Sequence, residues 1–87
     1  MSDSISKQAV KLASRYREHG EAPIASEIEA SLGEDWQTTS AVTRRSGKDR
    51  HYVTLILEYL YSEGRAERRR SEHGTAAWHW EWRGSLR

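Results

Sequence analysis

The sequence lacks cysteine and phenylalanine, and it has one proline among 87 residues. Without cysteine there is no disulfide framework, no thiolate metal site and no thiol nucleophile, which agrees with a reducing compartment. The longest apolar run, residues 53–57, is short and interrupted by Thr54, so no secretion signal or membrane span is visible. We therefore expect a soluble, cytoplasmic protein.

Signatures of catalysis are missing as well. We find no glycine-rich phosphate loop, no nucleophile motif around the serines and no paired carboxylates in an apolar setting. The histidines also lack the spacing of metal ligands; they are His19, His51, His73 and His79. We expect a protein that is not an enzyme and needs no cofactor or metal.

The chain length predicts a single domain, residues 1–87, with a small core. A chain of this size buries only about 60 to 65 percent of the surface that its unfolded form exposes. Large rings therefore matter, and in the absence of phenylalanine they come from tryptophan and tyrosine.

The net charge of +1 hides a division along the chain. Residues 1–43 carry four basic and seven acidic side chains, whereas residues 44–70 carry eight basic and four acidic ones. Residues 71–87 are balanced, with two of each. A positive segment of this kind indicates an anionic partner more strongly than the total charge does, although a solvated mixed surface is the alternative.

Two amphipathic helices are predicted in the N-terminal half. Apolar positions recur at helical spacing from residue 5 to about residue 17, with Ser4 or Asp3 as the cap. Lys7, Lys11, Arg15 and Glu18 point away from that apolar stripe. Pro23 opens a second helix, which Gly33 closes, with Glu27 and Glu29 on its outer side.

The middle of the chain predicts a helix-turn-helix at about residues 39–63. Thr39 or Ser40 begins the first helix, Gly47 ends it and Asp49 caps the second. Val53, Ile56, Leu57 and Leu60 form the inner stripe of that second helix.

Strands are expected on either side of these helices. The hairpin has strands at residues 66–70 and 75–82, with His73-Gly74 as the turn, and it forms a wing at about residues 65–82. A short strand at residues 34–37, containing Trp36, would pair with the hairpin. The expected fold is α+β.

This arrangement resembles prokaryotic winged helix-turn-helix transcription regulators. The likeness covers residues 38–84 and includes Gly47, the capped long helix and Glu63-Gly64-Arg65-Ala66-Glu67-Arg68. The segment from His73 to Trp80 is similar to the wing of small regulators of fimbrial operons. The resemblance implies a recognition helix in the DNA major groove and a basic wing on the backbone. The additional N-terminal helix, the low net charge and the apolar recognition helix depart from the pattern.

The residues themselves also indicate double-stranded DNA as the partner. An α-helix fits the major groove, and the first residues of a recognition helix meet the base edges. Arg50 is suited to guanine, Thr54 and Tyr52 to a thymine methyl, and Arg44 and Arg45 to phosphates. The candidate nucleic-acid-binding residues are Arg44, Arg45, Lys48, Arg50, His51, Tyr52, Thr54, Arg68, Arg69 and Arg70. In the wing, Arg68 and Arg70 share one strand face and Arg69 takes the other.

Aromatic residues leave two questions open. Trp78, Trp80 and Trp82 alternate on one strand face and are expected in the core, as is Trp36, with stacking of Trp82 on a base or a partner as the alternative. The second helix of the helix-turn-helix also has more large apolar side chains than one helix face can bury. The additional ones are Tyr52, Leu55, Tyr59 and Tyr61. Either the N-terminal helix covers them or a homodimer does, through Leu55, Tyr59 or that helix.

Two other functions fit the same pattern. One is a protein-interaction module of a larger assembly that docks through Leu55 and Tyr59. The other is binding of RNA or single-stranded DNA by stacking on the rings.

Overall fold

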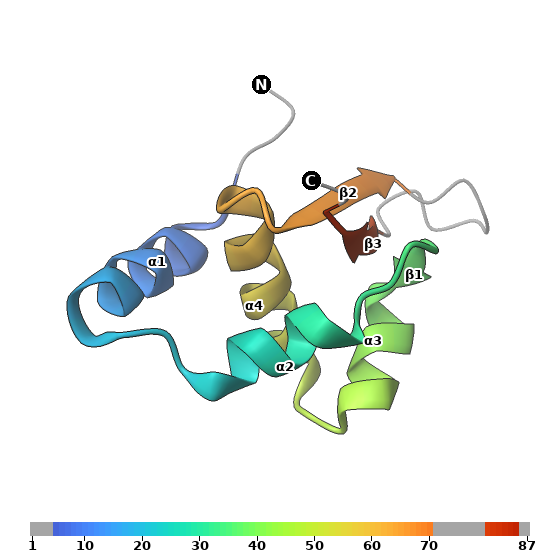
Figure 1. Cartoon of the computed structure of the whole chain (residues 1–87), viewed down its shortest axis with the longest axis horizontal. Helices are drawn as coiled ribbons and strands as arrows, with labels where there is room; N and C mark the ends of the chain where they lie inside the picture. The colour runs from blue at the N-terminus through green and yellow to red at the C-terminus, as the bar shows by residue number, and fades with distance from the viewer. Residues whose placement is uncertain (1–4, 71–79, 86–87) are drawn as a thin grey trace.

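Helices and a small sheet form the two parts of the structure (Figure 1). The computed structural model describes residues 5–70 and 80–85, and within them four helices accompany three antiparallel strands. The elements are α1 (Lys7–His19), α2 (Pro23–Ser31), β1 (Gln37–Thr38), α3 (Thr39–Ser46), α4 (Arg50–Ser62), β2 (Ala66–Arg70) and β3 (Trp80–Gly84). The fold is α+β, as predicted. None of the described helices is long and apolar enough to cross a membrane.

The first two helices differ at their ends from the prediction. Helix α1 begins two residues late because Ser6 is its cap, and the Ser6 Oγ accepts a hydrogen bond from the Ala9 amide at 3.2 Å. The expected caps Asp3 and Ser4 lie outside the described residues. Helix α2 begins at Pro23 as predicted but ends at Ser31, because the backbone of Leu32 is already extended, before Gly33 is reached.

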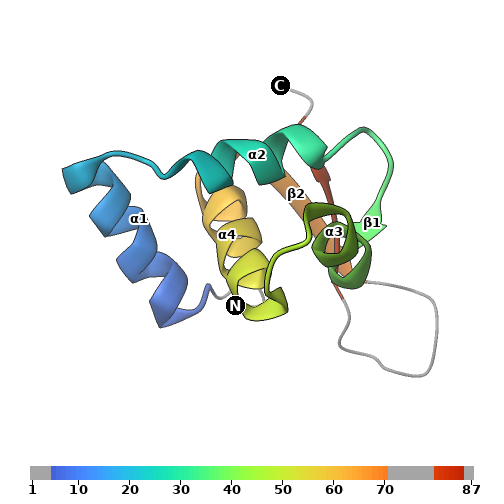
Figure 2. The same ribbon diagram turned by 90° about the horizontal axis from the view of Figure 1, so that it is seen from below.

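Helix α4 is the centre of the core. Its predicted inner stripe is confirmed, since Val53, Ile56, Leu57 and Leu60 are fully buried. Figure 2 shows α4 between α1 on one side and α3 on the other, with α2 across them. The rest of the described chain contributes Leu12, Ala13, Ala25, Ile28, Leu32, Val42, Ala66 and Trp82. Burial of each large aliphatic side chain contributes about 1.5 to 3 kcal/mol, as an upper limit.

Helix α1 covers Tyr59, one of the rings that exceed the capacity of this stripe. Tyr59 is 5% exposed, and its ring meets Tyr16 of α1 edge to face, with centroids 5.0 Å apart. Leu55 is partly buried against the same core. The chain therefore covers Tyr59 by itself, so the expectation that Tyr59 offers a surface for a second copy or a docking partner is wrong.

The sheet has the strand order β1-β3-β2, with all neighbours antiparallel. Strand β2 occupies the predicted residues, and β3 extends two residues beyond its predicted end, to Gly84. The third strand is confirmed as a partner of the hairpin strand, but it consists of Gln37 and Thr38 and follows Trp36. The turn His73-Gly74, the first part of the strand predicted at 75–82, and Trp78 lie outside the described residues.

The two faces of the sheet have different roles. Trp82, on the face toward the helices, is 1% exposed, and its Nε1 donates a hydrogen bond to the Thr39 Oγ1 at 2.8 Å. The expected core position of Trp82 is confirmed, and the alternative of stacking on a base or partner is wrong. Trp36 instead lies half-buried on the outer face, where Arg69 and Arg83 are each 4.5 Å from its ring. Its expected core position is wrong, because Trp36 alternates with the inward-facing Gln37.

Candidate nucleic-acid interface

The turn between α3 and α4 is closed by local hydrogen bonds. Gly47 adopts a left-handed conformation with φ 71°, and its amide donates to the Thr43 carbonyl at 3.0 Å. The Ser46 hydroxyl accepts from the Lys48 amide at 3.2 Å. The Asp49 Oδ2 accepts from the Tyr52 amide at 3.3 Å and so caps α4, as predicted. These contacts fix the direction in which α4 leaves α3.

Four predicted cationic residues surround this turn, and all are exposed. Arg44 and Arg45 occupy the last turn of α3, where the helix dipole favours positive charge. The Nη1 of Arg45 donates to the Ser31 carbonyl at 3.4 Å, and the Nη1 of Arg50 donates to the Ser40 hydroxyl at 3.0 Å. Both partners are neutral, so the positive charge of these side chains is not cancelled.

Arg65, just before β2, is in contrast paired with carboxylates. Arg65 makes two hydrogen bonds to Glu21, at 2.6 and 2.9 Å, and a third to Glu29 at 2.6 Å. The hydrogen-bonded guanidinium holds the pKa of Glu21 below its usual value, against the opposing effect of burial. The two carboxylates in turn raise the pKa of Arg65. Positive charge is therefore neutralised here, whereas around the α3–α4 turn it is not.

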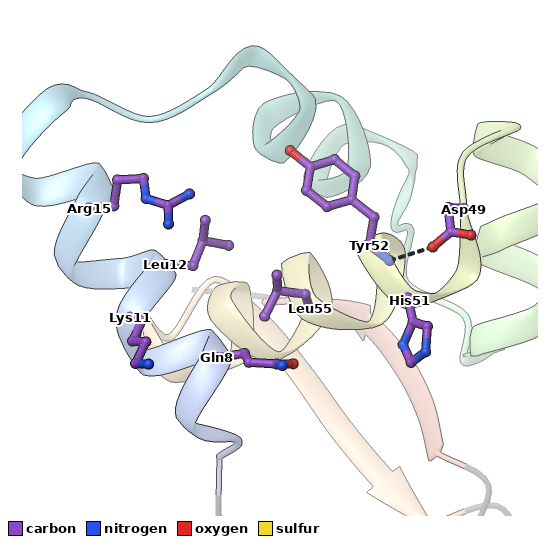
Figure 3. Close-up of a pocket in the computed structure, with 8 residues that line it drawn as sticks. All are labelled: Gln8, Lys11, Leu12, Arg15, Asp49, His51, Tyr52 and Leu55. Atoms are coloured by element: carbon purple, nitrogen blue, oxygen red, sulfur yellow. Dashed lines mark hydrogen bonds between the residues drawn. The ribbon is translucent and has the colours of Figure 1, made fainter.

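The predicted residues on α4 lie on two sides of the helix. His51 and Tyr52 are exposed, but Tyr52 faces α1 (Figure 3). Burial, with a smaller contribution from neighbouring Tyr52, raises the pKa of Tyr16 of α1 to about 12. The hydroxyl of half-buried Thr54 donates to the Arg50 carbonyl at 2.8 Å, so its oxygen remains an acceptor toward solvent.

The sheet separates the three predicted wing arginines, and their alternation is as predicted. On the inner face, the Arg68 guanidinium lies 3.9 Å from the Trp80 ring, and that of Arg70 lies 4.8 Å from the same ring. On the outer face, the Nε of Arg69 donates to Glu81 at 2.7 Å. Glu81 is 7% exposed, and its pairing with Arg69 was not predicted from the sequence. The strand alternation alone, which places Arg69 opposite Glu81, was the available signal.

The described part of the chain therefore brings Arg44, Arg45, Lys48, Arg50 and His51 to one turn, and places Arg68, Arg69 and Arg70 on the sheet. Within this part, no group of three His, Asp or Glu side chains forms a metal site. No protein-family model matches the sequence, and comparison with curated proteins and with solved structures finds no match either. The arrangement of the helices and the antiparallel sheet is compatible with a winged helix.

Proposed function

We propose that this protein is a winged helix-turn-helix regulator of transcription that binds double-stranded DNA in a sequence-specific manner. Helices α3 and α4 would form the helix-turn-helix, β2 and β3 the wing strands, and β1 the third strand of the sheet. The order α2, β1, α3, α4, β2, β3 supports this assignment. Helix α1 is an addition to the pattern.

The observation that carries the proposal is the distribution of uncancelled positive charge. Arg44, Arg45, Lys48 and Arg50 are exposed and form no ion pair with the described residues, and they surround the N-terminus of α4. In a helix-turn-helix this end of the second helix meets the base edges, while the first helix crosses the backbone. Arg50 would read a guanine, and Arg44 and Arg45 would contact phosphates.

The described tryptophans favour a duplex over unpaired strands. Stacking on bases needs open ring faces. Trp82 is buried, Trp80 lies against Arg68 and Arg70, and Trp36 lies against Arg69 and Arg83. The described tryptophans therefore offer little ring surface to a single strand.

The test is a selection of bound duplexes from a random pool, followed by fluorescence anisotropy of the enriched sequences at several salt concentrations. We expect an enriched motif and an affinity that decreases steeply with salt, because each neutralised phosphate contributes about 0.9 to the slope of log K against log salt. A palindromic motif would report binding by a dimer. No enrichment together with no duplex affinity would contradict the proposal.

Single substitutions distinguish contacts to the phosphates from contacts to the base edges. Arg44→Ala and Arg45→Ala should each weaken binding to every sequence alike and reduce the salt slope by about 0.9. Arg50→Ala should relax preference at one base position by about 1 to 3 kcal/mol, measured on duplexes that differ at single positions. Arg17→Ala is the control and should leave the affinity unchanged. Arg17 is exposed but is not a candidate binding residue, and its Nη1 lies 3.9 Å from the Glu63 carboxylate. If Arg50→Ala lowered the affinity equally for all sequences, Arg50 would not be a residue that recognises a base.

A further inference from the structure

Helices α1 and α4 border an open groove of about 510 Å³ beside the first turns of α4 (Figure 3). Leu12 extends into it from α1 and Leu55 from α4, so the bottom of the groove is apolar. The α1 wall is formed by Gln8, Lys11 and Arg15, and the α4 wall by Asp49, His51 and Tyr52.

The charge of this groove is positive. Lys11 and Arg15 are exposed and form no ion pair with the described residues, in contrast to Arg17 on the same helix. The one carboxylate in the lining, Asp49, already accepts the Tyr52 amide as the cap of α4. Two cations therefore line the groove, and neither has an acidic partner among the described residues.

We propose that this groove holds the phosphate backbone of one DNA strand, with Lys11 and Arg15 as phosphate contacts. The inference rests on the proposed function, because it places the strand that flanks the major groove entered by α4. Continuity of surface supports it, since His51 and Tyr52 belong both to the groove and to the predicted reading surface.

The spacing of the two cations suits a strand of phosphates. Lys11 and Arg15 are four residues apart on one helix face, which corresponds to a rise of about 6 Å. Each DNA strand carries one negative charge per roughly 3.4 Å of helix axis. The two long side chains therefore reach different phosphates of the same strand, and Gln8 adds a neutral hydrogen-bonding group one turn earlier.

Helix α1 is held in position for this role. The Ser6 hydroxyl donates to Glu58 of α4 at 2.6 Å near one end of α1, and the edge-to-face contact between Tyr16 and Tyr59 lies near the other. Buried Leu12 packs into the core between them. The distance between the α1 cations and α4 is thus set before DNA binds, which lowers the ordering cost of the contacts.

The experiment compares two double variants of the full chain on the enriched duplex. One is Lys11→Gln with Arg15→Gln in the groove, and its control is Lys7→Gln with Arg17→Gln, which removes the same charge from the same helix outside the groove. Fluorescence anisotropy across salt concentrations gives the slopes, and circular dichroism verifies that both variants fold. We expect the groove variant to lose about 1.8 from the salt slope, two phosphates at about 0.9 each, and the control to keep the slope of the parent protein.

Each other outcome has a definite meaning. Equal slopes for the groove and control variants, whether both are unchanged or both reduced, would overturn the groove inference and leave the proposed function standing. A parent protein that binds no duplex would overturn both. If that protein instead binds an acidic amphipathic peptide, and the groove variant does not, the groove belongs to a protein partner.

Discussion

At the scale of single residues, a buried side-chain hydrogen bond joins the sheet to the helices. The Nε1 of Trp82 donates to the Oγ1 of Thr39, the first residue of α3, and both residues are buried. An indole N–H in such a place needs a partner, since leaving a buried donor unsatisfied costs about 1 to 3 kcal/mol. The Trp82–Thr39 pair therefore aligns β3 with the helix that precedes the turn.

Replacement of both partners should reveal their coupling. Trp82→Phe is expected to lower the free energy of unfolding by about 2 to 4 kcal/mol, since it removes ring volume as well as the donor. In a double-mutant cycle with Thr39→Val, we expect a coupling of about 1 kcal/mol, measured by urea unfolding. Trp36→Phe on the outer face is the control and should show no coupling to Thr39→Val. Zero coupling for the Trp82 pair would contradict the structural role of the bond.

At the scale of elements, the turn between α3 and α4 depends on the backbone of Gly47. Its φ of 71° lies in the left-handed region, and a Cβ added there would meet nothing within 4 Å. A substitution at Gly47 therefore destabilises the fold through backbone strain and not through a steric clash. The angle between the two helices follows from this one residue and the cap at Asp49.

Gly47→Ala should lower the free energy of unfolding by about 1 to 2 kcal/mol, since alanine is strained in the left-handed region. Gly47→Asn should cost less, because asparagine tolerates that conformation. The matched control is Gly33→Ala: a Cβ at Gly33 also meets nothing within 4 Å, and its φ is not in the left-handed region. Chemical denaturation measures all three variants. Equal losses for Gly47→Ala and Gly33→Ala would argue against strain as the cause.

Element boundaries are predictable where the signal is local. The sequence correctly predicts that Pro23 begins α2, that Gly47 ends α3 and that Asp49 caps α4. Each of these residues acts on backbone groups no more than four residues away. The start of α1 was placed too early because several serines and an aspartate compete as caps in residues 2–6. Ser6 also donates to Glu58, a contact 52 residues away along the sequence that no local pattern reports.

At the scale of the whole molecule, ion pairs neutralise Arg65 but not the described arginines at the α3–α4 turn. Arg65 connects Glu21 and Glu29, which are 44 and 36 residues away along the chain, and Tyr59 donates to Glu21 at 3.0 Å. Neither partner of Arg65 was predictable from sequence, and Glu29 was expected on the outer side of α2. The candidate cations at the α3–α4 turn were predictable, whereas it takes the packing of residues 5–70 and 80–85 to show that none of those residues forms an ion pair with them.

The Arg65–Glu21 contact predicts an acid-sensitive stability. The folded-state pKa of Glu21 lies below the ordinary value of 4.5, so the unfolded chain binds more protons as the pH falls through this range. Glu21→Gln should therefore be about 1 to 2 kcal/mol less stable than the parent protein near pH 7. That difference should persist down to about pH 5 and shrink below pH 4.5, as the parent carboxylate takes up its proton.

Urea unfolding from pH 3 to pH 7 measures this difference. Glu27→Gln is the control, because Glu27 is exposed on α2 and forms no ion pair with the described residues. It should change stability by less than about 0.5 kcal/mol at any of these pH values. A Glu21→Gln difference that stays constant with pH would contradict the role of the carboxylate charge.

The strand order has a consequence for folding during synthesis on the ribosome. Strand β3 lies between β1 and β2, yet it is the last of the three to be synthesised. Until residues 80–84 leave the exit tunnel, β1 and β2 have no neighbour to pair with, and Thr39 has no indole to accept from. Helices α1, α2 and α3 can pack against α4 before that point, because all four helices precede β3 in the sequence. The three-stranded sheet can therefore form only after Trp82 has been synthesised.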